Sequence, residues 1–283
     1  MTARLNHKVI QWGDHSLDFT SKTLIMGILN VTPDSFSDGG QYNMAEKAKK
    51  HALAMVADGA DMIDIGGEST RPGYTKISEE EEIARLRPAL EAMRHDVHVP
   101  ISVDTYKAKV AEAALNAGAN IINDIWGAKY DEKMAHVAAH YDVPIILTHN
   151  REKANYSNLM IDILFDLKES IKICKKAGVK DERIIVDPGI GFAKTYEQNI
   201  LVMRNLEKLT QLGYPILLGT SKKSLVAKTL NLPIEERVEG TGATVCYGIT
   251  KGANIVRVHD IKEMSRMALM MDVMIGKKPI LKE

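Results

Sequence analysis

Several short apolar runs in the sequence end in a polar residue that could bind the edge of a flat heterocycle. Asp104, Asn123 and Asp187 each close such a run, and Lys223 follows another. A carboxylate can accept two hydrogen bonds from an amino-pyrimidinone edge, an amide can satisfy a ring nitrogen, and a lysine can donate to a ring carbonyl. Together these four residues predict a site for a nitrogen heterocycle.

A second set of residues suits a phosphorylated group. Arg71, Arg257 and His259, with Asn30, follow other apolar runs, and arginine binds phosphate oxygens through a bidentate fork. The run Ser-Lys-Lys-Ser at residues 221–224 stands at a predicted helix start, where free backbone N–H groups and the helix dipole favour an anion. The sequence therefore offers one half of a site for a heterocycle and another half for an anion.

Each of these residues also has an ordinary structural explanation. Asp187 begins a turn signature, Asn123 could cap a helix, and Ser221 is a good N-cap residue. However, a polar group closes every one of eight apolar runs, and Asp and Asn are costly at a barrel rim unless they are paired. The combination favours a functional site over a series of separate caps.

The elements that must position these residues alternate along most of the chain. Strands are expected at 24–29, 62–65, 100–103, 120–122, 144–147, 184–186, 215–218 and 255–258. Helices are expected at 44–58, 79–94, 107–117, 132–140, 159–177, 196–212, 224–250 with a break at Pro233, and 262–275. Repeated strand–helix units with nearly continuous apolar strands indicate an α/β fold with parallel pairing, and eight units fit a closed (β/α)8 TIM barrel. An open doubly wound sheet is the alternative, because periodicity cannot show closure.

Length and composition predict a single soluble domain. Residues 1–20 are expected to form an N-terminal extension with a possible hairpin, and residues 21–283 the barrel. Lys+Arg and Asp+Glu are equal at 37 each, so no overall field attracts nucleic acid or an anionic membrane. No apolar run approaches the about 18 residues of a membrane span, and no secretory signal is seen. We therefore expect a cytoplasmic protein whose partners are small molecules.

Six motifs resemble the dihydropteroate synthase family. They are Gly-Ile-Leu-Asn-Val-Thr-Pro-Asp-Ser-Phe-Ser-Asp-Gly-Gly (27–40), Gly-Gly-Glu-Ser-Thr-Arg-Pro-Gly (66–73), Ile-Ser-Val-Asp-Thr (101–105), Ile-Asn-Asp-Ile (122–125), Asp-Pro-Gly-Ile-Gly-Phe (187–192) and Arg-Val-His-Asp (257–260). The resemblance implies a transferase of folate biosynthesis with a (β/α)8 barrel, typically a homodimer that uses Mg²⁺. Such an enzyme joins 6-hydroxymethyl-7,8-dihydropterin diphosphate to p-aminobenzoate, with release of diphosphate, to make 7,8-dihydropteroate. Sulfonamides compete with p-aminobenzoate.

The resemblance also implies a role for individual residues. The pterin would be held by Asp104, Asn123, Asp187 and Lys223. The diphosphate would be held by Arg71, Arg257, His259 and Asn30, with Asn30 as the Mg²⁺ ligand. The p-aminobenzoate pocket would be shaped by Thr70, Pro72, Phe192 and Ser224. Diphosphate leaves from a CH₂ on an electron-rich ring, so positive charge spreads onto the ring. Asp104 and Asp187 would stabilise that cation, and Arg71, Arg257 and Mg²⁺ would stabilise the leaving anion. No protein nucleophile is needed, and Lys223 completes the predicted catalytic set.

The polar segment after the first barrel strand has two interpretations. Asp34 or Asp38 could simply cap the next helix. With the resemblance, residues 31–40 become a lid that closes over the diphosphate and the incoming amine, with Thr32, Pro33, Asp34 and Phe36 as lid residues.

Two residues depart from the family pattern. Many members have Arg where this chain has Lys222, and many close members have Met where it has Thr148. Lys222 keeps the charge but not the planar fork, and Thr148 removes volume from an expected wall of the pterin pocket. We expect both departures to weaken affinity without abolishing the chemistry.

Two other functions remain as alternatives. A pterin-binding methyltransferase would share the Asp and Asn contacts but has no need of Thr70, Arg71 and Pro72, or of a diphosphate site. A non-catalytic paralogue would bind pterin without condensing it. For the homodimer, a candidate surface is the apolar face of the last helix, with Met264, Met267, Leu269, Met270 and Met271.

Overall fold

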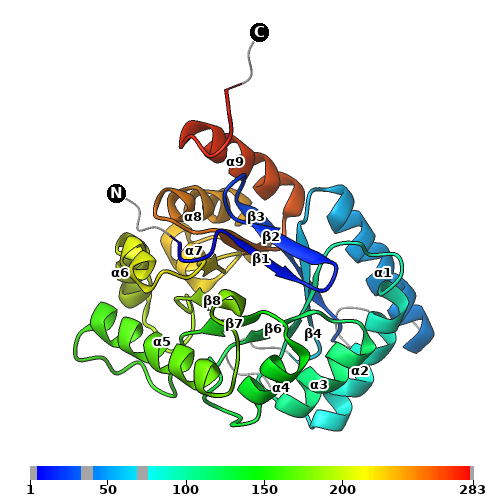
Figure 1. The fold of residues 1–283 in the computed structure, drawn as a ribbon. Helices are drawn as coiled ribbons and strands as arrows, with labels where there is room; N and C mark the ends of the chain where they lie inside the picture. Colours follow the sequence, from blue (N-terminus) through cyan, green and yellow to red (C-terminus); the bar gives the residue numbers. More distant parts are fainter. Residues whose placement is uncertain (1–4, 33–40, 69–75, 281–283) are drawn as a thin grey trace.

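The computed structural model describes residues 5–32, 41–68 and 76–280, and its centre is a sheet of eight parallel strands (Figure 1). The strands are β3 (Leu24–Asn30), β4 (Met62–Gly66), β5 (Ile101–Asp104), β6 (Ile121–Asp124), β7 (Ile145–Thr148), β8 (Ile184–Asp187), β9 (Leu217–Leu218) and β10 (Ile255–Val258). Their hydrogen-bonded order is β8-β7-β6-β5-β4-β3-β10-β9. The seam between β8 and β9 is joined by a parallel bridge from Val186 to Ile216, and Val186 N–H donates to Pro215 O at 2.9 Å. The sheet therefore curves into a barrel, which confirms the TIM-barrel prediction over the open sheet.

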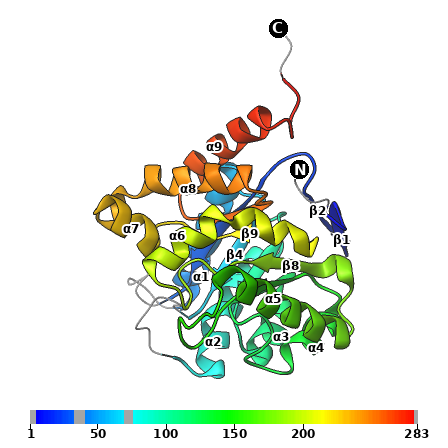
Figure 2. The same cartoon turned by 90° about the vertical axis from the view of Figure 1, so that its left-hand side faces the viewer.

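Helices surround the barrel, as Figures 1 and 2 show. They are α1 (Gln41–Ala57), α2 (Glu79–Met93), α3 (Ala108–Ala117), α4 (Met134–Tyr141), α5 (Leu159–Lys176), α6 (Tyr196–Arg204), α7 (Ser224–Leu230), α8 (Val238–Thr250) and α9 (Ile261–Met274). Short 3-10 helices occupy Asp181–Arg183, Leu206–Leu212 and Ile234–Glu236. The predicted alternation of strands and helices is confirmed, with boundaries that shift by a few residues.

Two long predicted helices are each divided in the structure. The helix expected over 196–212 ends at Arg204, because the Asn205 side chain donates to Leu201 O at 2.8 Å while its backbone leaves the helical region. The helix expected over 224–250 breaks where anticipated: Asn231 takes the left-handed conformation at φ +54°, Pro233 follows, and α8 begins at Val238.

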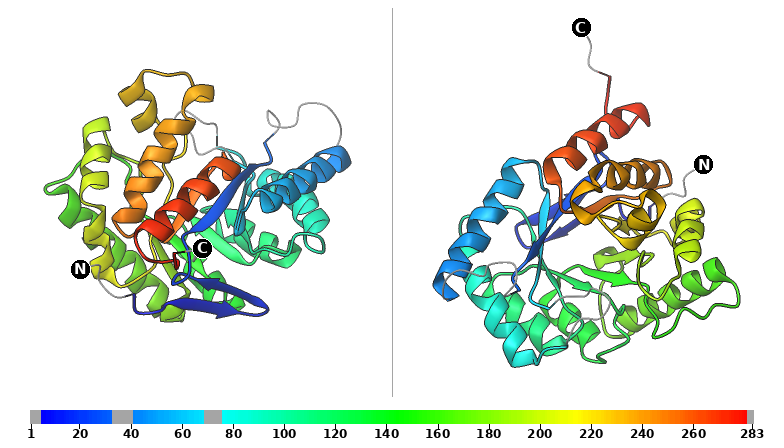
Figure 3. Two further views of the ribbon diagram at one scale, coloured as in Figure 1. Left: turned by 90° about the horizontal axis from the view of Figure 1, so that it is seen from above. Right: turned by 180° about the vertical axis from the view of Figure 1, so that it is seen from behind.

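An N-terminal hairpin covers the amino end of the barrel (Figure 3). It consists of β1 (Val9–Trp12) paired antiparallel with β2 (His15–Asp18), as predicted around Gly13. Its apolar face, which includes the buried Trp12, joins the main core. Trp12 Nε1 donates to Asn120 O at 2.9 Å, one residue before β6 begins. The hairpin thus closes the end of the barrel opposite to the carboxyl ends of the strands, while the boundary expected at residue 20 stays a prediction.

The last helix does not present the five predicted apolar residues as one exposed face. Met264 is fully buried in the core, and Met267 and Met271 pack against the core. Leu269 and Met270 are exposed, at 49% and 59% of their full area. The five residues therefore lie on two faces of α9: one face packs on the core, and the other, with Leu269 and Met270, faces outward. Among the helices that the structure describes, none has both the length and the apolarity required to cross a membrane.

Candidate active site

The residues predicted to bind a heterocycle converge at the carboxyl end of the barrel. Asp104 ends β5, Asn123 lies one residue before the end of β6, and Asp187 ends β8. Asp104 and Asn123 are direct partners in the strand register, and all three side chains are buried. Parallel strands bring their carboxyl ends to one rim, so residues far apart in the sequence become neighbours here.

Arg257 of β10 joins two carboxylates at the centre of this rim. Its Nε donates to Asp64 Oδ2 at 2.6 Å, and its Nη2 donates to Asp104 Oδ2 at 2.8 Å. Asn123 Nδ2 donates to the same Asp64 oxygen at 3.0 Å. Burial acts to lower the pKa of Arg257, but the Asp64 and Asp104 carboxylates outweigh it and raise that pKa above its ordinary value. The guanidinium therefore stays charged and joins β10 to β4 and β5, and the Asn123 bond to Asp64 adds β6 to the same network.

Asp64 was not anticipated from the sequence. It lies inside β4 between two isoleucines and has no exposed surface. A lone carboxylate within an apolar strand is the signal that could have identified it, because folding tolerates such a group only when it is paired. Ser102, its register partner on β5, is a second buried polar residue that was missed.

Four buried oxygens of this cluster have no hydrogen-bond partner among the described residues. They are Asp64 Oδ1, Ser102 Oγ, Asp104 Oδ1 and Asn123 Oδ1. Each such atom costs about 1–3 kcal/mol of stability if it stays unsatisfied. All four come from the adjacent strands β4, β5 and β6, which indicates a surface built to accept hydrogen bonds from a ligand.

The charges at the rim are unequal. Burial raises the pKa of Asp104 to about 7, although the Arg257 cation acts to lower it. Burial likewise raises the pKa of Asp187, against the opposing effect of the Lys223 ammonium. When all are ionised, three carboxylates (Asp64, Asp104, Asp187) face two cations (Arg257, Lys223), so one negative charge is left over. Such a group favours a ligand that donates hydrogen bonds or develops positive charge.

Lys223 approaches the rim from the segment between β9 and α7. Its Nζ donates to Ile190 O at 2.5 Å and lies 4.7 Å from the centroid of the Phe192 ring. Gly219 lies beside it: a Cβ there would be in ordinary van der Waals contact, at 3.8 Å, with both Lys223 Nζ and Arg257 Cβ. Burial lowers the pKa of Lys223 to about 8, partly offset by the Asp187 carboxylate. Lys223 and Phe192 therefore meet on the same side of the site.

The predicted anion-binding residues flank this centre. Ser221 Oγ lies 2.9 Å from His259 Nδ1 and accepts the His259 backbone N–H at 3.2 Å. Ser224 is exposed at the first position of α7. Lys222 has a left-handed backbone at φ +56°, and its Nζ donates to Asp260 Oδ1 at 2.8 Å. The single ammonium contact replaces the two that an arginine fork could make to that carboxylate.

Asn30 stands at the end of β3 beside the rim. A Cβ on Gly66 would lie 3.7 Å from both Asn30 Oδ1 and Asp104 Cβ, so this glycine separates the two side chains without filling the space. An amide oxygen is a ligand that Mg²⁺ accepts, and Mg²⁺ usually takes few protein ligands and completes its shell with substrate phosphates and water. The described residues contain no group of three or more His, Cys, Asp or Glu side chains arranged to hold a metal. Asn30 thus fits a Mg²⁺ ion that arrives with a phosphorylated substrate.

Several predicted residues lie outside the described residues. They are Pro33, Asp34 and Phe36 of the expected lid and Thr70, Arg71 and Pro72 of the second loop. Thr32, the first expected lid residue, is described and partly exposed. Their predicted roles stay predictions.

A buried ionic cluster lies next to the second of these loops. Lys107 Nζ donates to Glu68 Oε2 and Glu82 Oε2, both at 2.7 Å, and to Ile77 O at 2.9 Å. Glu68 Oε2 also accepts the Ile77 backbone N–H at 3.0 Å, and Tyr106 OH donates to Glu68 Oε1 at 2.7 Å. These bonds tie residue 68 to residue 77, on either side of the loop that carries Arg71. This cluster was not anticipated from the sequence.

Comparisons with known proteins agree with this geometry. The family model for pterin-binding enzymes matches residues 26–259. The dihydropteroate synthase of Bacillus subtilis (strain 168) is 59% identical over 270 residues, which cover 95% of this chain and 95% of that protein. The crystal structure of Clostridium difficile dihydropteroate synthase in the presence of pteroic acid superimposes with a TM-score of 0.89 at 49% identity, covering 91% of this chain and 98% of that chain. The Yersinia pestis enzyme with a sulfonamide drug complex gives a TM-score of 0.88 at 38% identity, covering 95% and 100%.

Proposed function

The chain belongs to the dihydropteroate synthase family of pterin-binding enzymes, and from this premise we infer that it condenses 6-hydroxymethyl-7,8-dihydropterin diphosphate with p-aminobenzoate. The products are 7,8-dihydropteroate and diphosphate, and the pathway is folate biosynthesis. The observation that carries the assignment is the set of four buried oxygens on β4, β5 and β6 that have no hydrogen-bond partner among the described residues. An amino-pyrimidinone edge supplies the missing donors.

The pterin half of the site uses the residues of the rim. Asp104 and Asn123 accept from the ring edge, Asp187 accepts from the opposite side, and Lys223 donates to the ring carbonyl. Asp104 Oδ1 and Asn123 Oδ1 are two of the four rim oxygens that have no hydrogen-bond partner among the described residues. Arg257 keeps Asp104 oriented through its Nη2 contact at 2.8 Å. This division of roles places the pterin over the carboxyl ends of β5, β6 and β8.

The diphosphate half uses cations and one metal. Arg71, Arg257 and His259 would hold the diphosphate, and Asn30 would hold a Mg²⁺ ion beside it. Bound Mg²⁺ supplies positive charge that stabilises the leaving diphosphate. The guanidinium of Arg257 stays charged between its two carboxylates, so it can serve the departing anion while it orients Asp104.

The reaction runs by loss of diphosphate before the amine attacks. The C–O bond to the diphosphate breaks with its electron pair on oxygen, and the positive charge left on the CH₂ spreads over the ring. Asp104 and Asp187 stabilise that charge, because preformed carboxylates in a site shielded from water act strongly on a developing cation. The amine nitrogen of p-aminobenzoate then forms the new C–N bond and loses its proton, without a protein nucleophile.

The amine pocket lies where Lys223 meets Phe192. Phe192, Thr70, Pro72 and Ser224 shape it, and the carboxylate of p-aminobenzoate is received at Ser224. Sulfonamides, which the Yersinia pestis enzyme binds, would compete at the same place. The predicted lid, residues 31–40, belongs to the same proposal, although residues 33–40 lie outside the described residues.

A direct assay tests the function. The purified protein is mixed with the dihydropterin diphosphate, p-aminobenzoate and Mg²⁺, and dihydropteroate is measured by mass spectrometry, with EDTA and Asp187→Asn as negative controls. Product that depends on Mg²⁺ and on Asp187 supports the assignment. If the protein binds the pterin but forms no product, it is a non-catalytic paralogue; methyl transfer from methyltetrahydrofolate to a corrinoid protein would instead favour the methyltransferase.

We also propose a cytoplasmic homodimer. The support is that α9 keeps the large apolar side chains of Leu269, Met270 and Met274 exposed, at 49%, 59% and 60%. Met270 and Met274 lie one helical turn apart, so they share a face. Met270→Glu should shift the protein from dimer to monomer in sedimentation velocity, whereas Lys262→Glu on the same helix should not.

A further inference from the structure

The loop between β8 and α6 is folded around the terminal nitrogen of Lys194, which bonds to its backbone. Lys194 Nζ donates to Gly189 O at 2.9 Å and to Phe192 O at 3.1 Å, and it lies 2.9 Å from His149 Nδ1. These three acceptors match the three N–H donors of a protonated lysine, although burial lowers the pKa of Lys194 to about 7 against the opposing Asp187 carboxylate. The backbone of the loop therefore surrounds the terminal nitrogen of Lys194, a residue near the end of the same loop.

The hydrogen bonds of His149 fix the tautomer of its ring. His149 Nε2 lies 3.0 Å from Asp166 Oδ2, and a carboxylate can only accept. Nε2 must then carry the proton, which leaves the lone pair of Nδ1 for Lys194. Burial, together with the Lys194 cation, lowers the pKa of His149 to about 3 against the opposing effect of Asp166, so the imidazole is neutral.

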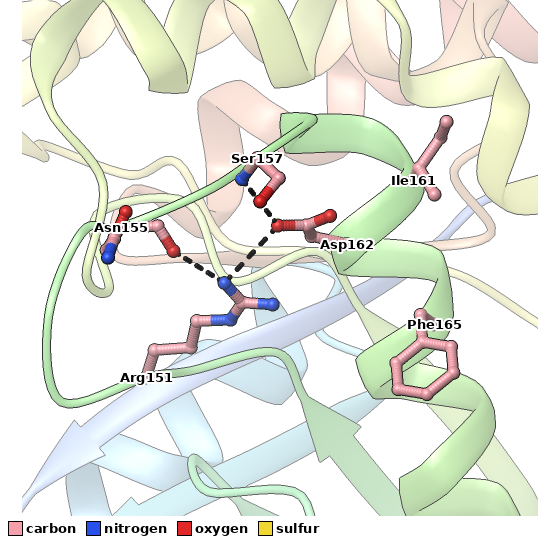
Figure 4. Close-up of a pocket in the computed structure, with 6 residues that line it drawn as sticks. All are labelled: Arg151, Asn155, Ser157, Ile161, Asp162 and Phe165. Carbon is pink, nitrogen blue, oxygen red and sulfur yellow. Dashed lines mark hydrogen bonds and ion pairs between the residues drawn. The ribbon is translucent and has the colours of Figure 1, made fainter.

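Asp166 links this pair to a salt bridge nearer the surface. Arg151 Nε donates to Asp166 Oδ2 at 2.6 Å. Arg151 Nη1 donates to Asn155 O at 2.6 Å and lies 3.5 Å from Asp162 Oδ2, at a groove that Figure 4 shows. Asp162 accepts the Ser157 backbone N–H at 2.9 Å. The chain of contacts thus anchors Lys194 to the start of α5.

The loop needs this anchor because its backbone is in unusual conformations. Gly189, Gly191 and Ala193 have φ values of +70°, +86° and +45°, and the left-handed region is unfavourable for alanine. A Cβ on Gly189 would lie 1.9 Å from His149 O, so the loop is packed against the His149 backbone. Such a conformation persists only where its surroundings hold it.

The loop contacts one residue of the proposed site, Lys223, and carries another, Phe192. Ile190 O accepts from Lys223 Nζ at 2.5 Å, and the Phe192 ring lies 4.7 Å from the same nitrogen. Asp187 is joined to the anchor as well, because its backbone O accepts the His149 N–H at 2.9 Å. Movement of the loop would displace Lys223 and Phe192 together.

We propose that Lys194 and His149 are positioning residues of the reaction, which set Lys223 and Phe192 through the β8–α6 loop. Neither is assigned a contact with a substrate. The proposal rests on the proposed function for its substrates, and its tests separate the two.

The first test is Lys194→Met, with Lys172→Met, at an exposed position of α5, as the matched control. kcat/KM for the dihydropterin diphosphate should fall about 100-fold, as expected when reacting groups are misplaced by about 1 Å, and KM for p-aminobenzoate should rise as Phe192 moves. A variant that is merely less folded has fewer active molecules, so its apparent kcat falls while both KM values stay unchanged. That second pattern would overturn the proposal.

The second test varies the acceptor and does not depend on the folding of Lys194→Met. His149→Gln keeps an oxygen for Lys194 and a donor for Asp166, whereas His149→Leu keeps neither. We expect His149→Gln to retain kcat/KM within about threefold and His149→Leu to lose as much as Lys194→Met. The double variant Lys194→Met/His149→Leu should be no worse than either single variant, because the effects of residues that act as one unit do not add. Equal losses for Gln and Leu would refute the role of the acceptor.

A binding measurement separates the inference from the proposed function. If the wild-type protein forms no dihydropteroate, the proposed function fails, yet titration calorimetry with pteroic acid still tests the positioning. The Kd should rise at least about tenfold in Lys194→Met and not in Lys172→Met. An unchanged Kd in Lys194→Met, or no binding to the wild-type protein, would overturn the inference.

Discussion

Asp64→Asn removes one negative charge from the rim without a change of shape. Asp64 Oδ2 accepts from Arg257 Nε at 2.6 Å and from Asn123 Nδ2 at 3.0 Å. Both bonds end on the same oxygen, which the carboxamide retains, so both can persist, but the charge that faces the guanidinium is lost. A hydrogen bond to a charged group contributes about 1.5–3 kcal/mol. A loss of about 2 kcal/mol corresponds to about a 30-fold decrease in kcat/KM.

The same variant should change the pH profile in a defined direction. The Asp64 carboxylate is one of the charges that raise the pKa of Asp104, after burial and against Arg257. Without it, Asp104 loses its proton at a lower pH. The acid limb of kcat/KM for the dihydropterin diphosphate should therefore move to lower pH even as the maximum falls.

The assay measures dihydropteroate by mass spectrometry over a pH series, with thermal unfolding recorded for each variant. Asp58→Asn, at an exposed position after α1, makes the same chemical change away from the rim and should leave both rate and profile unchanged. If Asp64→Asn stays within about twofold of wild type and its acid limb does not move, Asp64 does not act through Arg257 and Asp104, and the account of the rim is wrong.

Three further predictions concern the same region. Wild-type kcat/KM for the pterin substrate should rise through about pH 7 as Asp104 ionises and fall through about pH 8 as Lys223 loses its proton, which a pH–rate series will show. Lys222→Arg should raise the thermal midpoint by about 2 °C, equivalent to about 1 kcal/mol. The reason is that Asp260 Oδ2 is buried without a hydrogen-bond partner in the described parts of the chain, and the second arm of an arginine fork could donate to it. A lower midpoint in scanning calorimetry would contradict this. Thr148→Met should lower KM for the dihydropterin diphosphate about threefold by burying about one more CH₂ against the pterin, and an unchanged KM would show that residue 148 is not a pocket wall.

The barrel could be predicted from the sequence because its signals are local. Apolar runs such as Met62–Gly66 and Ile184–Asp187 are buried along their whole length, and the helices between them often end in glycine, as at Gly118 with φ +125°. Closure was not predictable in this way. It depends on a single bridge, Val186 to Ile216, between strands whose pairing no period in the sequence specifies.

The face of a helix that is buried was also beyond the sequence. The methionines of α9 have helical spacing throughout, yet Met264 is in the core and Met270 is exposed. Spacing shows which residues share a face, but only the neighbouring helix α8 and the barrel decide which face is covered.

The residues that could hold a pterin and a diphosphate were identifiable from residue type and position, because polar side chains at the ends of apolar strands have few other uses. Asp104, Asn123, Asp187 and Lys223 are brought together as the strand–helix alternation implied. Which charges pair was decided only by the tertiary structure. Arg257 reaches past β3 to Asp64, which is 193 residues away in the chain, and Lys194 of the β8–α6 loop reaches His149, which follows β7. Such pairings follow from the geometry of a closed barrel, in which side chains from distant strands point at one axis, and the sequence alone does not encode the distance between them.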